Sequence, residues 1–356
     1  MTDVLGLDIG GANTKAVYLR THGGKLVEAR TAVEYFPVWK EPAKLPSVLS
    51  ALPRRLGATN FDAVGITMTA ELSDAYQTKR EGVLQILGSA EDAFSNHKLL
   101  VLNVDARLES TAHAKKEPLG VAAANWAATG WMVAQKIADC VVVDVGSTSA
   151  SIIPVVAGKV AAKGKTDLDK LMCGELVYTG SLRTNVAAIV QHVPIRGGVA
   201  AVSSELFALS ADVHLALKHI SAAEYTCETA DGRGKTVPEA LARLARVVCA
   251  DTEMLTRQEI LGIADYVYDR QVEQVAEGLA KVYARVKKEA ESDVSVVVTG
   301  LGKDFIARKA AEKIGAKSIV DLARLMQCDV ALATPAFAVA LMAAGEVEGE
   351  AIYWTL

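Results

Sequence analysis

The stretch GLDIGGANTKA, residues 6–16, concentrates a carboxylate, two adjacent glycines and two polar side chains in one short turn. Apolar and β-branched residues stand on both sides, which predicts strand, turn and strand rather than the strand, turn and helix of a dinucleotide-binding unit. Glycine at such a turn lets backbone N–H groups approach phosphate oxygens. The predicted phosphate ligands are Gly10, Gly11, Asn13 and Thr14. Asp8 is the predicted ligand of a hydrated Mg²⁺ ion. The alternative interpretation of the whole stretch is an ordinary Gly-Gly hairpin without a ligand.

A second stretch, VDVGSTSASI at residues 143–152, repeats this chemistry. Its predicted phosphate ligands are Gly146, Ser147 and Thr148. Asp144 is predicted as a second metal ligand and as a candidate catalytic carboxylate. A turn closed by its own Ser and Thr side chains is the alternative for this stretch taken alone. Two Asp-containing turns at corresponding positions predict instead a duplicated chain whose two turns face each other across a cleft.

The length of 356 residues exceeds the size at which one hydrophobic core usually keeps growing, so two α/β lobes are expected. The first lobe is expected to comprise residues 1–127 plus 333–356 and to carry the first turn. The second lobe is expected to comprise residues 128–332 and to carry the second turn.

A third motif, VVVTGLGKDFIARKA at residues 296–310, predicts a buried strand, a tight turn and a helix. Gly300 and Gly302 are predicted to leave room for a flat ring or a phosphate at the start of the helix, where the N–H groups and the dipole favour anions. An ordinary strand-to-helix turn is the alternative.

The bulk composition excludes several classes of protein. The net charge of −4 without a Lys/Arg block argues against nucleic-acid binding. The apolar stretches are shorter than the roughly 20 residues that span a bilayer, and the N-terminus enters a strand at once instead of forming a leader. We therefore expect a cytoplasmic enzyme without a membrane or nucleic-acid partner, acting on small molecules, with a homo-oligomer left open.

The order of the three motifs resembles the sugar kinase/Hsp70/actin superfamily over the whole chain. The resemblance implies an actin-like, ribonuclease H-like fold, in which a β-meander and an α/β stretch occur in each of two lobes around a central cleft. It also implies a polyphosphate held between the two turns and an adenosine-type turn at residues 299–302.

Four further segments resemble the hydantoinase/oxoprolinase-related proteins of tetrahydromethanopterin-linked one-carbon metabolism. They are TMTAELSDAYQTKREGV at residues 67–83, GELVYTGSLRTNV at 174–186, SSELFALSADVHLAL at 203–217 and ETADGRGKT at 228–236. His214 departs from this pattern, in which Tyr is usual. The resemblance implies a methanofuran-forming transferase that joins an aminomethylfuran-methanol diphosphate to the phenol oxygen of γ-glutamyltyramine and releases pyrophosphate.

Such a transfer needs a base for the phenolic proton. Glu71 and Asp74 are the first candidates because they follow a buried strand at its C-terminal end, where α/β proteins usually bind ligands. A capped helix start is the equally weighted alternative. Glu205 and Asp212 are rivals, expected on one face of a helix, with surface charge as their alternative.

Cations are expected to hold the diphosphate or the glutamyl carboxylates. The candidates are Lys79, Arg183 and Arg196, and an ordinary surface position is the alternative for each arginine. The segment TADGRGKT, residues 229–236, is expected either to close over the diphosphate as a lid or to form a solvated turn.

Two other functions stay open at this point. An ATP-dependent small-molecule kinase would use Asp144 or Glu71 to deprotonate an acceptor hydroxyl. A nucleotide-gated binding module is the third possibility, although no appended peptide-binding or DNA-binding segment is evident in the sequence.

Overall fold

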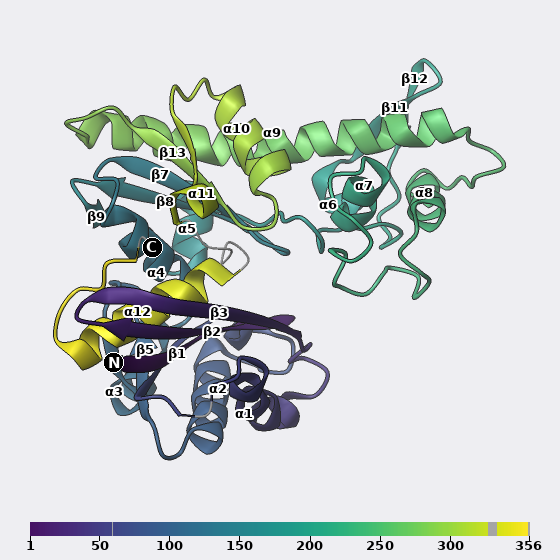
Figure 1. The fold of residues 1–356 in the computed structure, drawn as a ribbon. Helices are drawn as coiled ribbons and strands as arrows, with labels where there is room; N and C mark the ends of the chain where they lie inside the picture. Colours follow the sequence, from purple (N-terminus) through teal and green to yellow (C-terminus); the bar gives the residue numbers. More distant parts are fainter. Residues whose placement is uncertain (59, 327–332, 355–356) are drawn as a thin grey trace.

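The structure, a computed structural model, describes residues 1–58, 60–326 and 333–354. It consists of two α/β lobes, each built on a mixed sheet, with a long helix and a helical region beside the second lobe (Figure 1). The predicted two-lobed fold with a duplicated β-meander is confirmed.

The first sheet has the strand order β3-β2-β1-β4-β5-β6. Its strands are β1 (Thr2–Ile9), β2 (Asn13–His22), β3 (Lys25–Tyr35), β4 (Ala63–Met68), β5 (Lys98–Leu102) and β6 (Leu108–Ser110). Strand β1 pairs antiparallel with β2 across the first Gly turn and parallel with β4.

The second sheet has the order β10-β8-β7-β13-β14, with β9 paired to β8. Its strands are β7 (Cys140–Val145), β8 (Ala150–Val156), β9 (Lys159–Val160), β10 (Leu176–Val177), β13 (Ser295–Thr299) and β14 (Ile319–Asp321). Strand β7 pairs antiparallel with β8 and parallel with β13. Asp8 is the penultimate residue of β1, and Asp144 is the penultimate residue of β7. The two sheets therefore share the same strand arrangement and carry an aspartate at the same position.

Helix α12 (Thr334–Glu348) returns from the C-terminal part of the chain to pack on β1, β2 and β4 of the first sheet. Two strand glycines allow this close approach, since a Cβ on Gly6 would lie 2.1 Å from the carbonyl oxygen of Ala336, and one on Gly65 would lie 2.7 Å from that of Val339. The opposite face of the sheet is covered by α1 (Leu45–Arg55) and α2 (Lys79–Ala93), with α3 (Thr111–Lys116) beside them.

Helix α4 (Asn125–Ala134) joins the lobes, because it packs on both α12 and β8. The expected lobe boundary after residue 127 therefore falls inside a helix that contacts both lobes. The other expected boundary, after residue 332, adjoins residues 327–332, which lie outside the described part of the chain. Both boundaries stay predictions.

Helix α9 (Arg257–Glu289) covers β7 and β8 with one part and extends beyond the second sheet with the other (Figure 1). That extension carries a region with its own apolar core. The region contains α6 (Val186–Ile189), α7 (Ser210–Ala216), α8 (Val237–Arg246) and the hairpin of β11 (His192–Ile195) and β12 (Gly198–Ala201). The shorter helices of the second lobe are α5 (Asp167–Cys173), α10 (Arg308–Lys313) and α11 (Leu322–Met326).

Within the described residues, no helix combines the length and the apolar character that crossing a bilayer requires.

Candidate active site

The two predicted phosphate turns have matching geometry and open into one cavity. The Gly10 N–H donates to the carbonyl oxygen of Asn13 at 3.1 Å, and the Gly146 N–H donates to that of Ser149 at 3.0 Å. The cavity between the lobes has a volume of about 590 Å³. The predicted site residues that line it are Asp8, Gly10, Gly11, Asn13, Asp74, Gly146, Ser147, Thr148 and Arg183. Residues from both lobes therefore form a single binding space.

The carboxylates of the two turns are electrostatically unusual. Asp8 is 4% exposed, its Oδ2 lies 3.5 Å from Lys15 Nζ, and its buried Oδ1 has no hydrogen-bond partner in the described part of the chain. Burial raises the pKa of Asp8, and Lys15 partly opposes this. Burial also raises the pKa of Asp144 to about 6, and the nearby Asp8 charge adds to the rise. Both carboxyl groups have raised pKa values, and Asp8 Oδ1 has no hydrogen-bond partner in the described part of the chain. The pair is therefore suited to hold a cation.

The glycines of the third motif pack against the second turn rather than against open space. Gly300 has φ +85°, and a Cβ on it would lie 2.5 Å from Asp144 Oδ1 and 2.5 Å from the carbonyl oxygen of Val145. A Cβ on Gly302 would lie 2.6 Å from Ser181 Oγ. Neither glycine lines the cavity. This corrects the expectation of a free space for a ring or phosphate there: protein atoms fill it, and both glycines let the third motif support the second turn.

Helix α9 supports the same turn from behind. Gln271 Nε2 donates to Thr179 Oγ1 at 2.8 Å and to the carbonyl oxygen of Gly180 at 2.9 Å. A Cβ on Gly180 would come within 2.5 Å of the backbone of Thr148, so the two segments are in close contact. Gln271 Oε1 in turn accepts from Nε2 of the buried His214 at 2.9 Å. These buried contacts hold Thr148, a predicted phosphate ligand, from the side away from the cavity.

Glu71 lies behind the cavity wall. Its side chain is 1% exposed and does not line the cavity, and burial raises its pKa to about 7. Lys79 Nζ lies 3.6 Å from Glu71 Oε1 and 2.5 Å from Asp167 Oδ2, so Lys79 links the lobes through Asp167 instead of facing the cavity. Of the two first candidates for the base, only Asp74 lines the cavity.

The two predicted arginines have different environments. The Arg183 guanidinium lies 4.8 Å from the centre of the Trp39 ring and donates to Thr148 Oγ1 at 3.4 Å. Arg196 lies in the turn between β11 and β12, where its Nε donates to Glu259 at 2.7 Å and it does not line the cavity. The prediction of Arg196 as a phosphate ligand is wrong, because the hairpin that carries it packs on the helical region.

The rival carboxylates do not form a pair on one helix face. Helix α7 begins at Ser210, so the exposed Glu205 precedes it. Asp212 is fully buried and accepts from Arg243 Nε at 2.8 Å and from the Tyr225 hydroxyl at 3.2 Å. The shared helix face is wrong. The surface-charge alternative fits the exposed Glu205 but is wrong for Asp212, which is a buried ion-pair partner.

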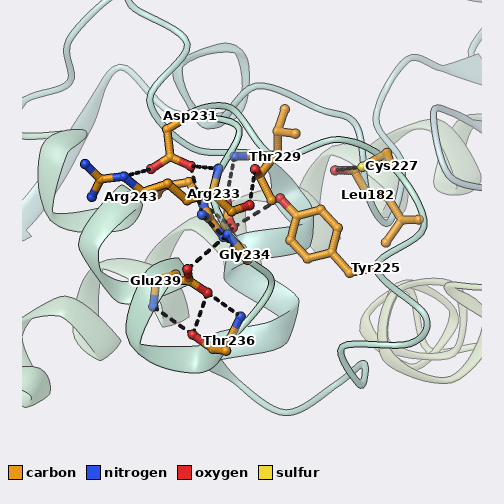
Figure 2. Close-up of polar contacts among 12 residues, drawn as sticks. Leu182, Tyr225, Cys227, Thr229, Asp231, Arg233, Gly234, Thr236, Glu239 and Arg243 are labelled. Carbon is orange, nitrogen blue, oxygen red and sulfur yellow. Dashed lines mark hydrogen bonds and ion pairs between the residues drawn. The ribbon is translucent and has the colours of Figure 1, made fainter.

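The segment at residues 229–236 is tied to helix α8, as Figure 2 shows. Asp231 accepts from Arg243 and Arg246, each at 3.0 Å, and the Gly234 N–H donates to Glu239 at 2.9 Å. None of these residues lines the cavity. The lid interpretation is wrong for this conformation, because the loop's own polar groups already bind the helix behind it.

Several cavity residues were not among the predicted site residues, although Lys15, Leu72 and Tyr178 lie inside quoted motifs. They are Lys15, Trp39, Leu72, Trp126, Asp167, Lys170 and Tyr178. Thr14, in contrast, is a predicted phosphate ligand that is fully buried and does not line the cavity. Aromatic and apolar side chains thus line the same cavity as both Gly turns. Such a space suits a ligand that carries both a ring and a polyanionic group.

Comparison with known proteins gives a consistent result along the chain. A family described as hydantoinase/oxoprolinase matches residues 62–345. A protein of Methanocaldococcus jannaschii named (4-{4-[2-(gamma-L-glutamylamino)ethyl]phenoxymethyl}furan-2-yl)methanamine synthase is 39% identical over 338 residues, which cover 95% of this chain and 96% of that one. A protein of the same name from Methanococcus vannielii is 34% identical over 214 residues, 60% of this chain and 94% of that one. A nucleotide-free acetone carboxylase structure is similar in fold, with a TM-score of 0.56 and 9% identity over 96% of this chain and 70% of that one.

Proposed function

The chain belongs to the hydantoinase/oxoprolinase family, and from that premise we propose that it is a transferase of methanofuran biosynthesis. It joins an aminomethylfuran-methanol diphosphate to the phenol oxygen of γ-glutamyltyramine and releases pyrophosphate. The observation that carries this proposal is the 39% identity, over 95% of the chain, to a protein named for the resulting ether.

The cavity supports the assignment of the diphosphate end. The Gly10 and Gly146 N–H groups close the two turns, so the donors proposed for the diphosphate are the other N–H groups of the turns and the hydroxyls of Ser147 and Thr148. Lys15 and Arg183 add positive charge to the same wall. A diphosphate bound here is stabilised as it leaves, because the donors are in place before the reaction starts.

Mg²⁺ is the cation that Asp8 and Asp144 would hold. Asp8 Oδ1 is buried without a partner in the described part of the chain, burial raises the pKa of both carboxyl groups, and the Asp8 charge raises that of Asp144 further. The described residues contain no group of three or more His, Cys, Asp or Glu that could hold a metal. Phosphate oxygens and water would therefore have to complete the coordination shell of an ion bound by these two carboxylates, which is how Mg²⁺ is usually bound. Bound there, the ion would offset the charge of the departing diphosphate.

The aromatic side chains that line the cavity support its assignment as the binding place of the furan and phenol rings of the two substrates. Trp39, Trp126 and Tyr178 line the cavity together with Leu72. The bond between the furan-bearing carbon and the diphosphate oxygen breaks with its electron pair on the diphosphate, and positive charge spreads into the furan ring. The phenol oxygen then forms the new carbon–oxygen bond and loses its proton to a base. Apolar walls keep water from competing for the same carbon.

The test is a nucleotide-free assay with purified protein, Mg²⁺, the furan diphosphate and γ-glutamyltyramine. We expect the ether by mass spectrometry and one pyrophosphate per ether. Asp8→Asn should reduce the rate by about 10²- to 10³-fold, as for other lost charge-stabilising groups. A fully active Asp8→Asn variant would exclude the proposed diphosphate grip.

The kinase alternative gives the opposite pattern in the same assay: ATP is consumed in an acceptor-dependent manner and the furan diphosphate is left intact. Tight ATP binding without turnover would favour the nucleotide-gated module.

A further inference from the structure

Lys170 is a buried lysine in the cavity wall that the reaction described above leaves unused. It lies on α5, is 2% exposed and lines the cavity. Its Nζ lies 3.8 Å from the centre of the Trp126 ring, and within the described residues its ammonium makes no hydrogen bond or ion pair. Gly164 packs against its stem, since a Cβ there would lie 2.6 Å from Lys170 Cγ. A lysine held in this way at a ligand cavity, with no ion-pair partner among residues 1–58, 60–326 and 333–354, requires an explanation.

The charged groups around Lys170 are already engaged elsewhere. Glu175 is fully buried and is bonded to Arg285, and its oxygens also accept the N–H groups of Lys163 and Gly164. Asp167, on the same helix, is bonded to Lys79. Burial lowers the pKa of Lys170 to about 7, while Glu175, Asp167 and Cys173 act in the opposite direction. Both the amine and the ammonium are therefore populated near neutral pH.

The carboxylates near the cavity are less suited to receive the proton of a phenol. Glu71 lies behind the wall and pairs with Lys79. Asp8 lies beside Lys15 at the phosphate end. Asp74 lines the cavity and is the remaining competitor. An unperturbed phenol has a pKa of ~10. The pKa difference between the phenol and a base that titrates near neutrality is smaller than the difference between the phenol and an ordinary carboxylate, so the proton transfer is easier.

Resting on the proposed function, we propose that the neutral Lys170 amine is the catalytic base that accepts the acceptor's phenolic proton as the ether bond forms. The phenol O–H bond breaks, its electron pair forms the bond to the furan-bearing carbon, and the carbon–diphosphate bond breaks with its pair on the diphosphate. No oxidant or reductant is involved, and the proton later passes to solvent.

The surroundings favour the charged product of this step. The ammonium that forms lies over the face of Trp126, where a cation is attracted by the ring. Glu175 and Asp167 both favour the protonated form of Lys170. Burial favours the neutral amine before the transfer, and Trp126, Glu175 and Asp167 stabilise the ammonium that forms.

The experiment uses the full chain with Lys170→Met and Lys170→Arg, and with Lys309→Met as the matched lysine control. Lys309 lies on α10, paired with Glu312 at the surface. The acceptor phenol is supplied unmodified and with ring fluorines that increase its acidity. Binding of Mg²⁺-pyrophosphate by calorimetry serves as the readout of an intact fold.

We expect kcat/KM of the unaltered protein to fall as the pH drops below about 7, because Lys170 becomes protonated. Both Lys170 variants should lose about 10²- to 10⁴-fold with the unmodified phenol, the usual contribution of a positioned base. The loss should shrink steadily as the phenol becomes more acidic, and pyrophosphate affinity should not change. Lys309→Met should behave like the unaltered protein.

The outcomes separate this proposal from the one it rests on. Absence of ether with the unaltered protein would overturn both. Ether formation together with full activity in Lys170→Met, or with a loss that does not depend on phenol acidity, would overturn the role of Lys170 alone. If Asp74→Asn instead shows the acidity-dependent loss, the base is Asp74 and the Lys170 proposal is wrong.

Discussion

Gly300→Ala should damage both the stability of the protein and its grip on a diphosphate. The residue has φ +85°, and the added Cβ would lie 2.5 Å from Asp144 Oδ1 and 2.5 Å from the Val145 carbonyl oxygen. A left-handed backbone costs a non-glycine residue about 1–2 kcal/mol, and overpacking a filled site costs about 1–3 kcal/mol. Together these give a loss of about 2–5 kcal/mol in the free energy of unfolding.

The assay is urea unfolding, followed by circular dichroism and tryptophan fluorescence, together with calorimetric binding of Mg²⁺-pyrophosphate. Gly262→Ala is the matched control, because Gly262 lies within α9 and a Cβ there meets nothing within 4 Å. That control should gain about 0.5–1 kcal/mol from the helix preference of alanine and bind normally. An unchanged unfolding midpoint and unchanged pyrophosphate binding in Gly300→Ala would refute the argument that the third motif supports the second turn.

Three further predictions follow from the site. Arg183→Ala should weaken Mg²⁺-pyrophosphate binding by about tenfold or more through the loss of a charged donor, whereas Arg196→Ala should not change it; equal effects in a calorimetric titration would contradict the placement of the two arginines. Arg243→Ala leaves the Asp212 carboxylate buried without its cation and should lower the free energy of unfolding by about 3–5 kcal/mol, measured by urea titration, without altering pyrophosphate affinity per folded molecule. Because the folded-state pKa of Asp144 is raised to about 6, the folded protein binds more protons than the unfolded chain between about pH 4 and 6, so this group's contribution to stability declines as the pH rises through that window. Asp144→Asn should remove that decline, raise stability at pH 7 and weaken Mg²⁺-dependent pyrophosphate binding; an unaltered pH profile of unfolding would speak against it.

The sequence allowed the two Gly turns to be located because the chemistry that marks them is local. A carboxylate, a glycine and hydroxyl donors act within one hairpin, so the spacing around Gly10 and Gly146 is sufficient to predict matching turns. The central strands also carry Asp8 and Asp144 at the same penultimate position, and this repetition predicted two lobes.

Predictions failed where long-range packing decides which side of an element is buried. Arg183 and Arg196 are equally charged and close in sequence, yet one lies over Trp39 in the cavity and the other pairs with Glu259 on the helical region. In the sequence, Asp212 cannot be told from an exposed carboxylate. Its burial depends on the ion pair with Arg243, which lies on another helix.

Helix α5 shows the limit most clearly. Leu168 is 67% exposed and Met172 is 78% exposed, whereas Lys170 between them is 2% exposed, which is the reverse of the pattern that hydrophobic periodicity predicts. Trp126 from α4 and Gly164 from the preceding loop enclose the lysine, and neither contact has a sequence signature.

The sequence by itself determined the pair of Gly turns, the duplicated scheme around them and the resemblance to a family, because each rests on residues that act together within a few positions. Only the tertiary structure decided which ionisable groups reach the cavity. It placed Glu71 behind the wall and Lys170 in it, because burial and pKa depend on the side chains that packing brings together from both lobes.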